Sequence, residues 1–352
     1  MPTVGEVAKH AGVAKSTVSL VFNNKPGVSE EMRHRVLEAA DELRAMEEAQ
    51  SLATLSADTN VVPGVPKTGT ESLSVVVLHP PILRSSQVFS ELLQGIQAGA
   101  ASHQIQLRLA SNEPDLPKDH ITRLYLSDPS LRPSGLLIIG ARRNEPLIAE
   151  ARQLGIPCVL VGRQSSDPTL AAVGRDEEEI TFLAASYLLD MGHRAIAFVG
   201  GDDVYSYTHS RLNGYRRALE QRNGPPLDRW IALGDGRAAA ERVLAGSPEI
   251  TAVIFVNDAY AMEGLPVFQA TGRVIPDDLS VISFDDTQEA GSFDPPLTSV
   301  SYPRFQEGLW SVKVLVDHIR QPLMKSCQIV FRASLIKRDS CAPPLKEARI
   351  SR

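Results

Sequence analysis

The fold of the N-terminal part of the chain is decided by residues 7–19, whose sequence is VAKHAGVAKSTVS. The small residues Ala8 and Ala11 stand where two short helices would cross, and Gly12 suits a tight turn between them. A second helix is expected from about Lys15, with Val18 on its inner side and short polar side chains that fit a DNA major groove, about 12 Å wide. The pattern predicts a helix-turn-helix; the alternative is a small helical bundle used for protein contacts.

The sequence on either side of this stretch extends the helical region. Thr3 and Glu6 have the spacing of a capping box at a helix start. A third helix is expected from about Ser29, and its apolar spacing continues without Gly or Pro, so that it could reach about residue 55 as a hinge helix. The following residues are rich in Pro, Gly and Thr and predict a linker. We therefore expect a headpiece over 1–55, a linker over 56–72, a ligand-binding domain over 73–340 and a tail over 341–352.

From residue 73, short β-rich runs alternate with helical stretches, which indicates βαβ units and parallel sheets. Strands are expected over 74–78, 104–109, 136–139, 158–161, 195–199, 253–255 and 280–283, and helices over 86–101, 176–191, 210–222 and 259–270. The predicted fold class is α/β, with an all-α helix-turn-helix headpiece and a two-lobed domain. Such sheets bind ligands beyond the carboxyl ends of their strands, where this sequence places Arg163, Asn257 and Asp285.

Several motifs, in order along almost the whole chain, give a specific resemblance. The N-terminal VAKHAGVAKSTVS resembles the DNA-binding signature of the lactose-repressor (LacI/GalR) family. Further similarities are GLLII at 135–139, GHRAIAF at 192–198, RLNGY at 211–215, ND at 257–258 with Ala261, SFDD at 283–286 and PPLT at 295–298. The resemblance implies a periplasmic-binding-protein-like effector domain and a transcription repressor, controlled by a sugar or sugar phosphate, that binds double-stranded operator DNA as a homodimer.

The resemblance also implies roles in DNA binding for individual residues. Lys15 and Ser16 correspond to positions that read base edges, and Leu20 replaces a common Arg and would contact a thymine methyl group. Leu52 corresponds to the leucine that wedges into the minor groove; the alternative is an ordinary helix leucine. Hydrogen bonds to phosphate are expected from Thr3, Thr17, Ser19 and Asn23. The sequence departs from the family at Ala14, where a capping Ser is usual, and in a hinge that lacks the Pro-Asn start.

In the effector domain, Arg211, Asn257 and Asp285 correspond to effector-contacting positions. The alternative for Arg211 and Asp285 is that they pair only with each other. Phe89 resembles an apolar contact, with core packing as its alternative. Gly162 stands where many relatives have an Asp, so it offers no carboxylate while the neighbouring cation, Arg163, remains. Because we expect Arg163 and Arg211 both to project into the cleft, with Asp285 as its clearest acid, we expect an anionic ligand. If Arg163 instead folds onto Asp167, the pocket is neutral.

Two further motifs are given structural interpretations. Gly234-Asp235-Gly236 resembles half of a dinucleotide fingerprint, but it lacks the third glycine and the ribose-binding acid. We interpret it as a helix-start loop that lines the effector cleft. His193 is interpreted as a structural turn residue, because no nucleophile motif accompanies it.

Composition limits the remaining classes of protein. The net charge of −6 does not favour nucleic acid, but no acidic residue lies between Glu6 and Glu30, where three lysines occur. The three cysteines are far apart, so neither a disulfide framework nor a metal site is expected, and no cofactor is implied. No apolar run could span a membrane and no secretion signal is evident, so we expect a cytoplasmic protein. The alternatives to a regulator are a solute-binding protein with the same two lobes and an enzyme acting on the cleft ligand, for which no nucleophile and base pair is found.

Overall fold

The computed structural model describes residues 3–22, 28, 29, 32, 33, 35, 36, 39, 40, 73–80, 86–111, 121–143, 145–202, 204–222, 224, 226 and 228–345. The chain divides into two compact units, Met1–Glu71 and Ser72–Arg352. The predictions for Asn23, Leu52, the hinge helix, the linker and the end of the tail lie outside the described residues. The four-part domain division remains a prediction.

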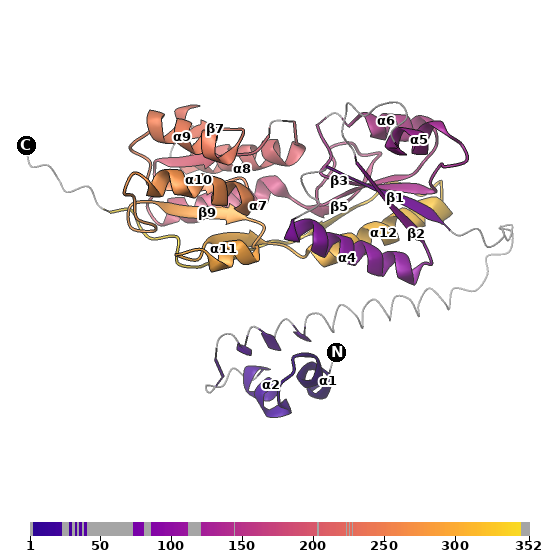
Figure 1. The fold of residues 1–352 in the computed structure, drawn as a ribbon, viewed down its shortest axis with the longest axis horizontal. Coiled ribbons are helices and arrows are strands. Elements are labelled where there is room, and N and C mark those ends of the chain that lie inside the picture. Colours follow the sequence, from indigo (N-terminus) through magenta and orange to yellow (C-terminus); the bar gives the residue numbers. More distant parts are fainter. Residues whose placement is uncertain are drawn as a thin grey trace, which may run out of the picture. The chain divides into compact units, whose positions relative to one another are not determined.

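The first unit contains the expected pair of helices, α1 (Val4–His10) and α2 (Lys15–Phe22) (Figure 1). Gly12 has a φ of +65°, which the turn between them requires and which side chains other than glycine rarely adopt. Phe22, at the end of α2, is 43% exposed. The buried core of this unit consists of Val7, Ala8, Ala11, Val18, Val21, Val36, Ala39 and Ala40.

The second unit consists of two lobes, each built on a sheet of six strands. The first lobe has the strand order β11-β5-β4-β3-β1-β2, and every pairing is parallel. Its strands are β1 (Ser74–His79), β2 (Gln106–Ser111), β3 (Gly135–Ile139), β4 (Cys158–Val161), β5 (Ala171–Arg175) and β11 (Gln328–Phe331). Its helices are α4 (Gln87–Ser102), α5 (Ile121–Ser127), α6 (Pro146–Gln153) and α12 (Arg304–Arg320).

The second lobe has the order β12-β10-β9-β8-β6-β7, parallel except where β12 pairs with β10. Its strands are β6 (Ile196–Val199), β7 (Ile231–Ala232), β8 (Ala252–Phe255), β9 (Ser280–Phe284), β10 (Thr298–Ser301) and β12 (Ser334–Ile336). Its helices are α7 (Glu177–Asp190), α8 (Ser206–Arg222), α9 (Gly236–Gly246), α10 (Asp258–Gln269) and α11 (Gln288–Ser292), with a short 3₁₀ turn over Asp228–Trp230.

Three crossings of the chain join the lobes. The chain passes from β5 to α7, from β10 back to α12, and from β11 to β12. The first crossing is made at Asp176, which caps α7 by accepting a hydrogen bond from the Glu179 amide. Residues at these crossings are close to both lobes.

All seven predicted strands and four predicted helices are present, with ends that shift by a few residues. The largest difference is α8, which begins at Ser206, one turn before the predicted start. The predictions did not include β5, β10, β11, β12 and α12, which lie at the three crossings. In the first lobe, α12 packs closely on α4, where a Cβ added to Gly95 would lie 1.9 Å from the Phe305 carbonyl oxygen.

Candidate ligand cleft and DNA-binding helix

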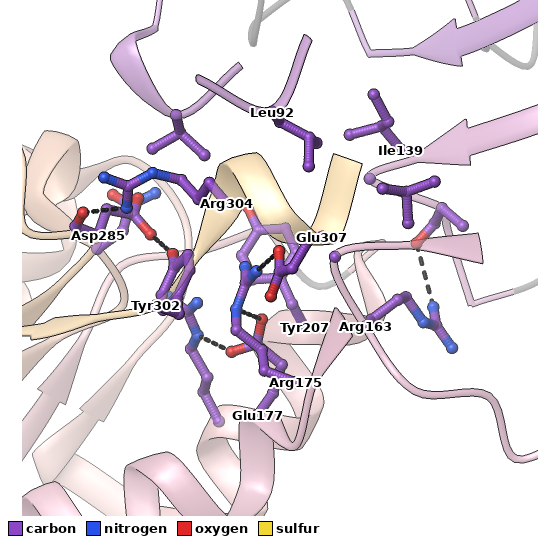
Figure 2. Close-up of a pocket in the computed structure, with 17 residues that line it drawn as sticks. Leu92, Ile139, Arg163, Arg175, Glu177, Tyr207, Asp285, Tyr302, Arg304 and Glu307 are labelled. Atoms are coloured by element: carbon purple, nitrogen blue, oxygen red, sulfur yellow. Dashed lines mark hydrogen bonds and ion pairs between the residues drawn. The ribbon is translucent and has the colours of Figure 1, made fainter. Parts of the chain in front are cut away.

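A cavity of about 90 Å³ lies between the lobes of the second unit, where the carboxyl ends of β3, β4, β5, β8 and β9 meet (Figure 2). This volume is smaller than the ~300–1,000 Å³ of a typical small-molecule pocket. Its lining consists of Val88, Leu92, Ile139, Gly140, Ala141, Val161, Gly162, Arg163, Arg175, Glu177, Tyr207, Arg211, Asn257, Asp285, Tyr302, Arg304 and Glu307. The space inside the cleft is therefore small, and most of its polar lining is charged.

Four of the five predicted effector contacts line this cavity. Arg163, Arg211, Asn257 and Asp285 are brought together from the two lobes. Phe89 does not line the cavity, because its ring is buried in the core of the first lobe and lies 4.8 Å from the His79 ring. Phe89 therefore has the alternative role given above, which is core packing and not ligand contact. Val88 and Leu92, on either side of it in α4, face the cavity instead.

Arg211 is buried in α8 and bonds to groups other than Asp285. Its Nε lies 2.7 Å from Glu177 Oε2, and a guanidinium N–H donates to the Val256 carbonyl oxygen. The guanidinium also stacks 4.5 Å from the centre of the Phe284 ring. The hypothesis that Arg211 and Asp285 pair only with each other is therefore wrong. Asn257 has a capping role, since its Oδ1 accepts a hydrogen bond from the Tyr260 amide at the start of α10.

Asp285 is held at the end of β9 in a strained backbone conformation, with a φ of +104°. Its carboxylate accepts a hydrogen bond from the Tyr302 hydroxyl. The turn is supported by buried Asp258, whose Oδ2 accepts from the amide and hydroxyl of Thr287 at 2.8 and 3.0 Å. Burial raises the pKa of Asp285 to about 7, although the charge of Arg211 opposes the shift.

Arg163 differs from the other arginines of the cleft. Its Nε donates to the Gln164 carbonyl oxygen at 2.9 Å and a terminal N–H donates to the Ala141 carbonyl oxygen at 3.4 Å. The alternative that Arg163 folds onto Asp167 is wrong, because Asp167 pairs with Arg152 at 2.7 Å. Within the part of the chain that the structure describes, Arg163 is the one arginine of this lining without a carboxylate partner.

The charged residues that sequence analysis missed form an ion-pair network. Arg175, at the end of β5, lies 3.0 Å from Glu177 Oε1 through its Nε and 2.7 Å from Glu307 Oε2 through a terminal nitrogen. Burial alone would raise the pKa of Glu177, but the guanidinium groups of Arg175 and Arg211 lower it below its usual value. Burial raises the pKa of Glu307, against the effect of Arg175. The expectation that Asp285 is the clearest acid is therefore wrong, since Glu177 and Glu307 share the cavity.

The second crossing supplies a further arginine. Arg304, the first residue of α12, lies 2.7 Å from Glu91 Oε2 of α4 through its Nε, and it donates a hydrogen bond to the Asp285 carbonyl oxygen. Four arginines and three carboxylates line the cavity, and Glu91 provides a fourth carboxylate behind it. The internal acids thus balance most of the positive charge on which the expectation of an anionic ligand was based.

In the first unit, the second helix presents a polar outer face. Lys15, Ser16 and Ser19 are exposed, whereas Thr17 and Leu20 are half-buried. Thr3, just before α1, is exposed as well. Ala14 occupies the cap of α2, where its carbonyl oxygen accepts from the Thr17 and Val18 amides. The side chain of Ala14 cannot accept a hydrogen bond, which leaves the helix without a stabilising contribution of roughly 1 kcal/mol.

Two motifs have structural roles. Asp235 caps α9 by accepting from the Ala238 amide, as expected for a helix start, but residues 234–236 do not line the cavity; that part of the interpretation was wrong. His193 is buried and its ring nitrogens lie 2.9 Å from Thr251 Oγ1, 3.0 Å from Ser280 Oγ and 2.9 Å from the Ala342 carbonyl oxygen. His193 thus connects the turn before β6 to Thr251, to β9 and to the C-terminal segment after β12.

Comparisons with known proteins agree with both units. Residues 3–44 match the family described as bacterial regulatory proteins, lacI family, and residues 185–341 match a periplasmic binding protein-like domain. The chain is 28% identical to the HTH-type transcriptional repressor PurR of Aliivibrio salmonicida, with 91% of this chain and 93% of that protein covered. It is also 28% identical to catabolite control protein A of Priestia megaterium, with 92% and 94% covered.

A solved structure extends this similarity over both parts of the chain. The complex of the transcriptional regulator CelR with cellobiose has a TM-score of 0.71 and 27% identity, and the match covers 97% of this chain and 100% of that one. The helix-turn-helix and the two-lobed unit define a DNA-binding transcription regulator with a domain of the ligand-binding type. Over nearly its whole length the chain is therefore similar to bacterial regulators of the lacI type.

Among the residues that the structure describes, no helix is long and apolar enough to cross a membrane. Over the same residues, no group of three or more His, Cys, Asp or Glu side chains is arranged to hold a metal ion.

The raised pKa of Asp285 predicts how stability depends on pH. Since the pKa of about 7 in the folded protein lies above the value of roughly 4 for an unfolded aspartate, the folded protein binds more protons between these values. Its free energy of unfolding should therefore fall as pH rises through this window. Relative to Asp285→Asn, which cannot titrate, the loss should reach at most about 1.4 kcal/mol per pH unit.

Chemical denaturation at several pH values measures this difference. Asp167→Asn is the matched control, because hydrogen bonds from Thr169 and Arg152 lower the pKa of Asp167 to about 2, so its effect should be flat above pH ~5. A difference between wild type and Asp285→Asn that does not change with pH would contradict the assignment.

Proposed function

We propose that this regulator is a repressor that binds double-stranded operator DNA as a homodimer and that a small molecule in the interlobe cleft controls its DNA affinity. The observation that supports this most directly is the exposed polar face of α2 on a compact helix-turn-helix core. One such headpiece makes few contacts, and two related by symmetry double them on a palindromic site. The proposal includes a cytoplasmic location and no catalytic activity.

The proposed DNA contacts follow from the position of each side chain on the headpiece. Lys15 and Ser16 stand at the start of α2, where a recognition helix contacts base edges. Leu20 lies further along the helix and would contact a thymine methyl group. Thr3, Thr17 and Ser19 would hydrogen-bond phosphate groups and so set the position of the headpiece. From the sequence alone, we also propose that Asn23 contacts a phosphate group and that Leu52 contacts the minor groove.

The change Lys15→Ala should weaken binding to an operator selected from random duplexes by the wild-type protein. If Lys15 contacts a phosphate, the slope of log affinity against log salt should become shallower by about 0.9. If it contacts a base, discrimination among the selected duplexes should fall instead. Fluorescence anisotropy at several salt concentrations measures both, and sedimentation of the complex should give two chains per duplex.

Arg237→Ala is the control for this experiment, since Arg237 is an exposed cation on α9 in the other unit. It should leave affinity and salt dependence unchanged. If Lys15→Ala binds DNA with the affinity and specificity of the wild type, the proposal that α2 contacts DNA is contradicted.

The proposed effector is a sugar or a sugar phosphate. The related regulator CelR was solved with cellobiose, and the cleft of this chain offers hydroxyl partners through Arg163, Arg211, Asn257 and Asp285. A preference for phosphate would depend on Arg163, because among the described residues it forms no ion pair with a carboxylate. A hydrogen bond to a charged group contributes about 1.5–3 kcal/mol, against about 1 kcal/mol for a neutral one.

Calorimetric titration with matched neutral and phosphorylated sugars tests this preference. The wild type should bind the phosphorylated sugar from a few-fold to about thirtyfold more tightly, and Arg163→Ala should remove the difference. Arg152→Ala, a surface arginine paired with Asp167, should keep it. Equal affinity of the wild type for both sugars would contradict an anionic effector.

A further inference from the structure

The charged side chains of the cleft form a continuous connection from one lobe to the other. It runs from Arg211 of α8 to Glu177 of α7, then to Arg175 at the end of β5 and to Glu307 of α12. The three contacts are 2.7, 3.0 and 2.7 Å long, and the four side chains are each at most 10% exposed. Arg211 and Glu177 belong to the second lobe and Arg175 and Glu307 to the first, so within this chain of contacts the Arg175–Glu177 ion pair is the one that joins the lobes.

Other contacts between the lobes are formed at the same time. The Arg143 amide donates to the Val204 carbonyl oxygen at 3.0 Å, and the Gln288 amide donates to Gln87 Oε1 at 2.9 Å. Arg304 bonds to Glu91 of the first lobe and to the Asp285 carbonyl oxygen of the second. The lobes are therefore held together along several parts of the cleft.

Arg175 is placed where a ligand would be enclosed. Its guanidinium lies 3.5 Å from the centre of the Tyr302 ring, between the Glu177 and Glu307 carboxylates (Figure 2). An aromatic face combined with two carboxylates is a binding site for a guanidinium group, through cation–π attraction and charge-assisted bonds. The group that fills it comes from the crossing between β5 and α7, and the space left beside it is about 90 Å³.

We propose that the cleft is a guanidinium site occupied by the chain itself: Arg175, bound by Tyr302, Glu177 and Glu307, acts as an internal ligand that keeps the lobes closed without an effector. We call these four residues the Arg175 latch. Its connection to DNA binding rests on the proposed function. An external effector must displace or rearrange the latch, so its affinity is reduced by the free energy of opening.

The latch is tested by removing the internal ligand and supplying it from solution. In the full chain, Arg175→Ala leaves the Tyr302 ring and the two carboxylates without their cation, and ethylguanidine has the size and charge of the missing group. Hydrogen exchange measured by mass spectrometry reports lobe closure through the Arg143 and Gln288 amides, which bond across the cleft. Amides of β3 and β8, within the sheets, report the integrity of each lobe.

We expect the two interlobe amides to exchange more than about tenfold faster in Arg175→Ala, because removing one partner of a buried ion pair is strongly destabilising. The β3 and β8 amides should stay protected. Millimolar ethylguanidine should restore slow exchange in this variant and have no effect on the wild type. Ethylammonium, which lacks the planar fork of donors, should restore it less.

Two variants serve as comparisons. Glu307→Gln keeps the shape of the latch but removes one carboxylate, so its interlobe amides should also exchange faster, and ethylguanidine should not slow them because Arg175 still fills the site. Arg152→Ala breaks an exposed ion pair of the first lobe and should behave as the wild type. If Arg175→Ala does not fold, Glu307→Gln alone decides: unchanged interlobe exchange in that variant overturns the proposal.

Unchanged exchange in Arg175→Ala, or faster exchange that ethylguanidine does not reverse, would also overturn the latch. These outcomes are separate from a failure of the proposed function. A protein that shows the rescue but binds no operator DNA would have the latch without the proposed regulatory role. If the protein binds operator DNA but ethylguanidine does not rescue Arg175→Ala, the proposed regulatory role stands and the latch is contradicted.

Discussion

The arrangement of the ligand-binding unit depends on the guanidinium of Arg175 and the three groups that surround it. Arg175 and Glu177 lie on either side of the chain crossing from β5 to α7, and Tyr302 lies at the crossing from β10 to α12. Their contacts therefore connect two of the segments that any motion between the lobes must bend. Glu307 extends the connection into α12, which packs on the first sheet.

Burying these charges has an energetic cost that only a complete set of partners can offset. The desolvation of an ion in a protein interior costs several kcal/mol, and one missing partner leaves a buried charge without compensation. Glu177 contacts both Arg175 and Arg211. In the described part of the chain, however, Arg175 Nε, Glu177 Oε1 and Glu307 Oε1 are all buried without a hydrogen-bond partner. An arriving donor could therefore compete with the internal network at either carboxylate.

The sequence was sufficient to predict those parts of the fold that local patterns determine. The turn at Gly12, the buried strands such as β3 and the capped helix that follows Asp176 all have short-range causes, and all were found. Arg211, Asn257 and Asp285 were placed in the cleft because motifs and strand ends marked them. The assignment of Phe89 was wrong because one helical position decides whether a side chain faces the cavity or the core.

The latch could not be predicted in the same way, because its members are far apart in sequence. Arg175 and Glu307 are separated by more than a hundred residues and meet only after both crossings have formed. The short strand that ends at Arg175, Ala-Ala-Val-Gly-Arg, also has a weak pattern and was missed. The one local indication was Arg175 itself, a charged residue immediately before the capping Asp176. Its position suggests that the crossing has a role other than packing.

The most direct test of the account is the distance between the lobes of the ligand-free protein. Spin labels at Gln153 in the first lobe and Glu220 in the second, both exposed, would report it in a variant whose three cysteines are replaced by serine. Double electron–electron resonance should give a single narrow distance that corresponds to the closed structure, without any added ligand. A broad distribution dominated by longer distances would show that the lobes separate when empty, and would contradict an internally closed cleft.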